Sequence, residues 1–120
     1  MTSTLDRLTA CIQTAVRRRD AVSTETYRLM KAHALELALA ENRHTVREVD
    51  LRASLLAWRA HLLQLMKVYV SYGAQGEGHS DRLVSDVAHC DEVLGPEEPP
   101  TAELLRLQRA AELALRTKFS

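Results

Sequence analysis

The sequence predicts an all-α protein, folded as a compact bundle of four to five antiparallel helices in a single domain. Apolar residues recur at three- and four-residue steps along most of the 120 positions, which is the spacing of one face of an α-helix. The 4 Gly and 3 Pro fall between these periodic segments. Hydrophobic residues make up 46% and charged residues 27% of the chain, a composition typical of a globular helical domain.

The first two helices are predicted over residues 4–19 and 24–42. The first has an apolar face made of Leu5, Leu8, Ile12, Ala15 and Val16. It ends in three arginines, residues 17–19, whose charges favour the carboxyl end of a helix dipole. The second has a wider apolar face, made of Tyr27, Met30, Ala34, Leu37 and Ala38, with Leu35 and Leu39 beside it. This width predicts that the second helix is covered on more than one side.

The third helix is predicted over residues 46–72 and carries two apolar seams. One seam consists of Leu55, Trp58, Leu62, Leu65, Tyr69 and Tyr72, and the other of Val49, Ala53, Leu56, Ala60, Leu63 and Val70. A helix with two seams needs two partners, so it belongs in a tightly packed bundle or at an interface between chains. Thr45 is the expected N-cap, paired with Glu48 three residues on, and Gly73 is the expected end.

The last two helices are predicted over residues 80–94 and 101–118. A glycine-punctuated connector, 74–79, precedes the fourth helix, and it lacks the Lys-Ser/Thr of a phosphate-binding loop. Gly95 and Pro96 are expected to end the fourth helix. Thr101 is expected to cap the fifth.

Composition and charge argue against several kinds of partner. The chain has 16 basic and 16 acidic residues, so no net positive field is available to hold nucleic acid. No segment approaches the ~18 apolar residues of a membrane span, and the first residues lack the pattern of a secretion signal. Cys11 and Cys90 lie far apart at helical apolar spacing, which favours reduced core residues over a disulfide. We therefore expect a cytoplasmic protein without a nucleic-acid partner, membrane contact or cofactor.

Two carboxylate–histidine pairs could supply metal ligands. Glu41 precedes His44 by three residues, and Asp86 precedes His89 by the same step. Such a pair in each half of a bundle resembles the ligand pattern of di-iron carboxylate proteins, and the resemblance implies a metal site at these four residues. The alternative is that they lie at solvated helix ends, because no carboxylate on the apolar faces of the first and third helices completes the set.

His61 lies on the polar side of the third helix and could accept a phosphoryl group. An exposed histidine in the middle of a helix in a four-helix bundle resembles the phosphoacceptor of histidine phosphotransfer domains. Their motif is similar to His-x-Leu-Lys-Gly, of which Leu63 matches, whereas Gln64 and Leu65 replace the lysine and the small residue. The alternative is a titratable surface histidine with no function.

The residues around the seams of the third helix suggest a protein interface. Arg52 and Arg59 project between the seams beside Trp58, and arginine and tryptophan are enriched at binding hot spots. The predicted interface comprises Trp58, Arg52, Arg59, Leu55, Leu62 and Tyr69. We therefore expect a non-enzymatic interaction protein, such as an adaptor, chaperone or regulatory subunit, that forms a homodimer or binds a partner helix. The alternative is that both arginines cover the bundle with their aliphatic parts and keep their charges in water.

Overall fold

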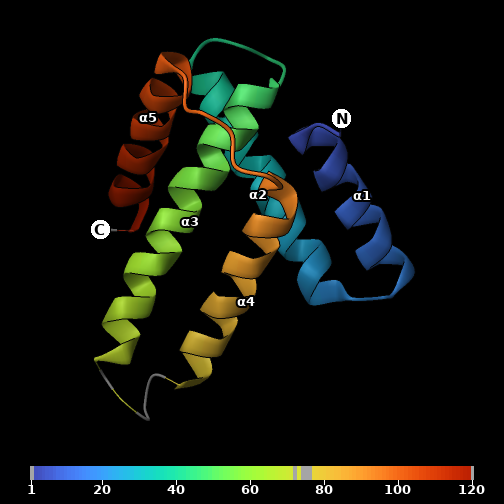
Figure 1. Ribbon diagram of the computed structural model, residues 1–120, viewed down its shortest axis with the longest axis vertical. Coiled ribbons are helices and arrows are strands. Elements are labelled where there is room, and N and C mark those ends of the chain that lie inside the picture. Colours follow the sequence, from blue (N-terminus) through green and yellow to red (C-terminus); the bar gives the residue numbers. More distant parts are fainter. Residues whose placement is uncertain (1, 72, 74–76, 120) are drawn as a thin grey trace.

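The computed structural model describes residues 2–71, 73 and 77–119, and this part of the chain is a bundle of helices without strands (Figure 1). The helices are α1 (Thr4–Arg17), α2 (Ala21–Ala40), α3 (Glu48–Val70), α4 (Glu77–Leu94) and α5 (Ala102–Phe119). The predicted all-α fold is confirmed, and each helix begins and ends within three residues of the position expected from the sequence.

α3 lies at the centre of the bundle and packs against each of the other four helices. The five consecutive residues from Leu51 to Leu55 are all buried. Five consecutive positions span more than one full turn, so this part of α3 is covered on every side. Over this stretch both apolar seams therefore pack against helices of the same chain.

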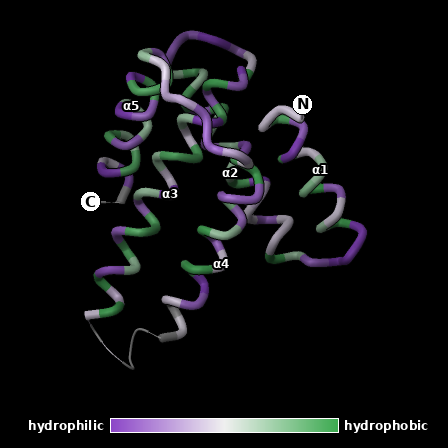
Figure 2. The backbone as a smooth tube through the Cα atoms, in the orientation of Figure 1, coloured by the Kyte–Doolittle hydropathy of each residue, from purple (hydrophilic) through white to green (hydrophobic). Residues whose placement is uncertain are grey.

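The core is built from all five helices. Its buried side chains include Leu8 of α1, Met30 and Ala34 of α2, Leu51 and Leu55 of α3, Cys90 and Val93 of α4, and Leu107 of α5. Figure 2 shows that hydrophilic residues gather in the turn between α1 and α2 and in the connection between α2 and α3. The connections therefore run over the surface, and the helices supply the core.

The start of α3 differs from the expected cap. Thr45 was the expected N-cap, but α3 begins after Arg47, so this prediction is wrong. The backbone N–H of Arg47 donates to Asp50 Oδ2 over 2.8 Å. Asp50 is fully buried and also accepts two hydrogen bonds from the guanidinium of Arg43, one of them over 2.5 Å. The carboxylate at the third position of the helix thus accepts from the N–H of the N-cap residue, which is the part that the sequence pattern gave to Glu48.

Glu48 caps a different helix from the one expected. Its carboxylate accepts hydrogen bonds from the backbone N–H groups of Thr4 at 2.8 Å and Leu5 at 3.1 Å. These are the first residues of α1, whose N–H groups have no partner within the helix. Ser3 completes this cap by accepting from the N–H of Asp6 at 3.0 Å. The start of α1 is therefore fixed to the start of α3.

The ends of α4 and α5 follow the sequence closely. Gly95 takes a left-handed conformation with φ of +66° directly after α4, and Thr101 Oγ1 accepts from the N–H of Leu104 at 3.1 Å. Both predictions are confirmed. Residues 74–76 of the expected connector and Tyr72 of the first seam lie outside the described residues, and α4 begins at Glu77, earlier than expected.

Candidate functional site

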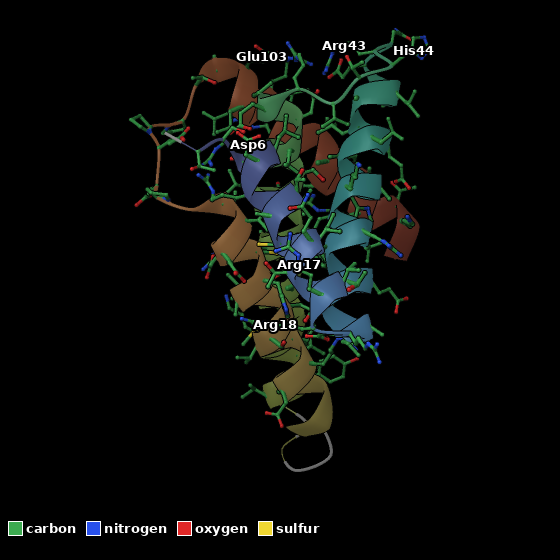
Figure 3. All side chains as sticks on the ribbon, turned by 90° about the vertical axis from the view of Figure 1, so that its right-hand side faces the viewer. Asp6, Arg17, Arg18, Arg43, His44 and Glu103 are labelled. Carbon is green, nitrogen blue, oxygen red and sulfur yellow. The ribbon has the colours of Figure 1, made fainter. Side chains whose placement is uncertain are left out.

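The ends of α3 and α4 that flank their connection reach past the ends of α1, α2 and α5 (Figure 1). The view in Figure 3, turned by 90°, shows the same projection at the lower end of the molecule. We call this projection the α3–α4 arm and define it as residues 65–70 of α3 and 80–87 of α4. At its base, Arg59 Nε donates to Asp91 Oδ1 over 2.7 Å and joins the two helices.

The arm exposes large apolar side chains. Val70 is 72% exposed, Val84 52% and Val68 43%. Other apolar residues of the arm are only partly buried where they pack against the core: Leu65, Met66, Tyr69 and Val87. The cause is geometric, because two helices can bury apolar side chains only along the line where they meet.

The charged side chains of the arm have both signs. Lys67 and Arg82 are positive, and Asp81 and Asp86 are negative. Arg82 Nε lies 3.4 Å from Asp86 Oδ1, one helical turn away on α4. The arm therefore presents apolar residues among charges that balance one another.

Four of the six predicted interface residues lie inside the bundle. Leu55, Trp58, Leu62 and Arg52 are between 1% and 7% exposed in the single chain. The other two, Arg59 and Tyr69, lie at the base of the arm and on the arm itself. Sequence periodicity could not separate these groups, because a seam against another helix of the same chain has the same spacing as a seam against a partner.

Arg52 binds the end of α4. Its Nη1 donates to the main-chain oxygen of Leu94 at 2.8 Å and to Thr4 Oγ1 at 3.0 Å. Its Nε lies 3.6 Å from Glu98 Oε2 and is buried without a hydrogen-bond partner in the described structure. Arg52 is therefore a structural residue that joins α1, α3 and the end of α4.

The four predicted metal ligands lie in separate environments. Glu41 pairs with Arg106 of α5 at 2.6 Å, and His44 is exposed at the end of the molecule opposite the arm (Figure 3). Asp86 pairs with Arg82, whereas His89 Nε2 lies 3.0 Å from Ser23 Oγ. In the part of the chain that the structure describes, no group of three or more His, Cys, Asp and Glu side chains is placed to hold a metal.

His61 is half-buried on the side of α3 that faces α5. It lines a groove together with Gln64 of α3 and with Glu112 and Arg116 of α5. A phosphoacceptor role for His61 remains a prediction, and the neighbouring acidic and basic side chains of α5 would border any approaching partner.

A polar pocket of about 340 Å³ lies between α1, α2 and α4 and was not anticipated from the sequence. On one side, the Tyr27 hydroxyl donates to Glu92 Oε2 at 2.9 Å, and burial together with this hydrogen bond raises the pKa of Tyr27. Burial and the nearby Glu92 carboxylate also raise the pKa of the Cys11 thiol. Both groups are thus held in their protonated forms at neutral pH.

The other side of this pocket holds the imidazole of His89. Its Nδ1 lies 2.6 Å from the main-chain oxygen of Ser85, and its ring meets that of Tyr27 edge to face at 5.0 Å. Ser23 Oγ, beside His89 Nε2, also donates to Asp20 Oδ2 at 2.7 Å. The hydroxyl proton of Ser23 thus points to a carboxylate. The contact between Ser23 and His89 links α4 to the start of α2.

None of the described helices is long and apolar enough to cross a membrane. Comparisons of the chain with protein-family models, with curated proteins and with solved structures found no match.

Proposed function

We propose that this protein is a small, non-enzymatic protein-interaction module, of the adaptor, chaperone or regulatory-subunit kind, that self-associates through the α3–α4 arm. The observation that carries the proposal is the exposure of Val68, Val70 and Val84 on two helices that project from the rest of the bundle. Exposed apolar side chains on a projecting element are of the kind that protein contacts bury.

A second copy of the chain is the occupant that fits the arm best. Two helical hairpins placed side by side form a four-helix arrangement, in which apolar residues on the outer sides of each hairpin become buried. The arm carries both charge signs, so a two-fold contact can set Lys67 and Arg82 of one copy against Asp81 and Asp86 of the other. A strongly acidic or basic partner has no matching field on this surface.

The residues that the sequence singled out then have distinct parts in the assembly. Arg59 joins the two helices at the base of the arm through its 2.7 Å contact with Asp91. Tyr69 lies on the arm and would contribute directly to the contact. Trp58 and Leu55 are buried in the core of the single chain and would not contribute directly to the contact.

The site of action that we propose is the cytoplasm. Both Cys11 and Cys90 are free thiols, and Cys90 is fully buried. Free, buried cysteines are compatible with a reducing compartment.

The proposal is tested by replacing exposed valines of the arm with a charged residue. We expect Val70→Asp and Val84→Asp to shift the protein toward the monomer in sedimentation-velocity experiments over a range of concentrations. Leu113→Asp is the matched control, because Leu113 is 63% exposed on α5, away from the arm. If the control dissociates the protein and the arm variants do not, the contact lies elsewhere.

A further inference from the structure

A second cavity lies between α2 and α5 where both helices pack on α3, and its lining is more apolar than that of the polar pocket. Its volume is about 220 Å³. Trp58 of α3 and Leu37 of α2 line it, and His33 of α2 lies beside Trp58 with the two ring centres 5.9 Å apart. It is distinct from the arm, so an inference about it is independent of the proposed self-association.

The cavity exists because small residues face one another across α2 and α5. Ala40 lies on the α2 side, and Ala110, Ala111 and Ala114 lie on the α5 side. The larger buried residues of α5, such as Leu107, hold that helix against the rest of the core. The alanines then leave space where longer side chains would have met in close packing.

The charges at the rim of the cavity cancel in pairs. Arg106 of α5 contacts Glu41 of α2 at 2.6 Å, and Lys118 of α5 lies 3.7 Å from Glu36 of α2. Each pair uses one basic and one acidic side chain, so neither charge sign is left to attract an ionic ligand. All four side chains are more than a quarter exposed, so these pairs are weak and can open to admit a molecule.

We propose that the cavity between α2 and α5 binds a small, neutral aromatic molecule of one or two rings. Benzene fits an enclosed apolar cavity of about 150 Å³, so this partly open cavity of about 220 Å³ has room for a substituted ring. The aromatic rings of Trp58 and His33 offer it edge and face contacts. Burial lowers the pKa of His33, with Lys118 acting in the same direction and Glu36 against it, which keeps this wall uncharged at neutral pH.

Trp58 is the single tryptophan of the chain, so its fluorescence reports directly on the cavity. The probe is bromobenzene, whose heavy atom quenches tryptophan emission on contact. We expect saturable quenching with a Kd on the order of 0.1–1 mM, in keeping with the binding energy available to a ligand of this size. Strictly linear quenching, like that of free N-acetyltryptophanamide, would overturn the proposal.

Two cavity-filling variants locate the bound probe. Ala114→Leu and Ala110→Leu each add a side chain at an exposed lining position, so the folded core is not overpacked. We expect each to raise the Kd at least tenfold, whereas Ala32→Leu, at an exposed position of α2 outside the cavity, leaves it unchanged. Circular dichroism checks that each variant is folded. Saturable quenching that neither cavity variant alters would place the probe elsewhere and refute the site.

Discussion

Arg52 of α3 donates a hydrogen bond to the main-chain oxygen of Leu94, the last residue of α4, over 2.8 Å. A second arginine, Arg7 of α1, donates to the same oxygen at 2.7 Å and to the oxygen of Val93 at 2.8 Å. The last carbonyl groups of a helix have no partner within it and carry partial negative charge. Two guanidinium groups from two other helices therefore cap the end of α4, which is one of the two helices of the arm.

Replacing Arg52 should destabilise the fold more than replacing an exposed arginine. Arg52→Ala removes two hydrogen bonds from a charged group that is 7% exposed, so we expect a loss of about 2–3 kcal/mol in the free energy of unfolding. Arg59→Ala is the control, and we expect it to cost under about 1 kcal/mol because its pair with Asp91 is exposed. Urea titration measures both, and equal losses would refute the capping role.

Gly95 and Gly73 allow a matched test of the contact with Arg7. Both glycines are left-handed, with φ of +66° and +59°. A Cβ on Gly95 would lie 2.6 Å from Arg7 Cζ, whereas a Cβ on Gly73 would meet nothing within 4 Å. We expect Gly73→Ala to cost about 1 kcal/mol from backbone strain alone. Gly95→Ala should cost at least about 1 kcal/mol more, because Arg7 must leave its carbonyl partners. Similar midpoints in urea for the two variants would contradict this.

The buried carboxylate of Asp50 should make the free energy of unfolding depend on pH in the acidic range. Burial alone would raise the pKa of Asp50, but the Arg43 guanidinium and the Arg47 N–H hold it below its usual value. A lowered pKa stabilises the fold above the unfolded value near 4, and this contribution is lost as the pH falls through the folded pKa. We expect Asp50→Asn to cost about 2–3 kcal/mol at pH 7.

The same variant should respond less to acid than the wild-type protein. Urea midpoints measured between pH 7 and pH 3 should fall further for the wild-type protein than for Asp50→Asn. The pKa of Glu48 is also lowered by its contacts with Thr4, despite the opposing effect of burial, so some acid sensitivity should persist in the variant. Parallel falls in the two proteins would show that Asp50 is not the group responsible.

The two thiols should differ in reactivity. Burial raises the pKa of Cys90 to about 12, and Cys90 is fully buried, whereas Cys11 is half-buried at the polar pocket. Alkylation requires the thiolate, so iodoacetamide at pH 8 should label Cys11 first and Cys90 only after unfolding. Peptide mass spectrometry over time gives the order. Early labelling of Cys90 would contradict the packing of α4 against the core.

The sequence predicted the helices well, because each has a clear 3.6-residue pattern and most of the breaks contain Gly, Pro or a capping residue. It failed at the start of α3, where Thr45 and Glu48 match a capping box but Asp50 makes the hydrogen bond. Glu48 instead accepts hydrogen bonds from the N–H groups of Thr4 and Leu5, which lie 44 and 43 residues away in the chain. Such contacts depend on tertiary structure and leave no local pattern.

The candidate sites were less predictable than the fold. Periodicity marked Trp58 and Leu62 as contact residues, but it carries no information on whether the contact lies within the chain. The polar pocket joins Cys11, Tyr27 and His89 from three helices, and no spacing along the sequence links them. The cavity between α2 and α5 arises from alanines, which in a sequence are simply good helix formers.

The native mass of the 120-residue protein tests the central claim most directly. Light scattering on a size-exclusion column, over at least a hundredfold range of concentration, would measure it. Self-association through the arm predicts a species of twice the chain mass of 13.5 kDa that dissociates on dilution and is lost in Val70→Asp. A mass of one chain at every concentration would contradict the proposed function.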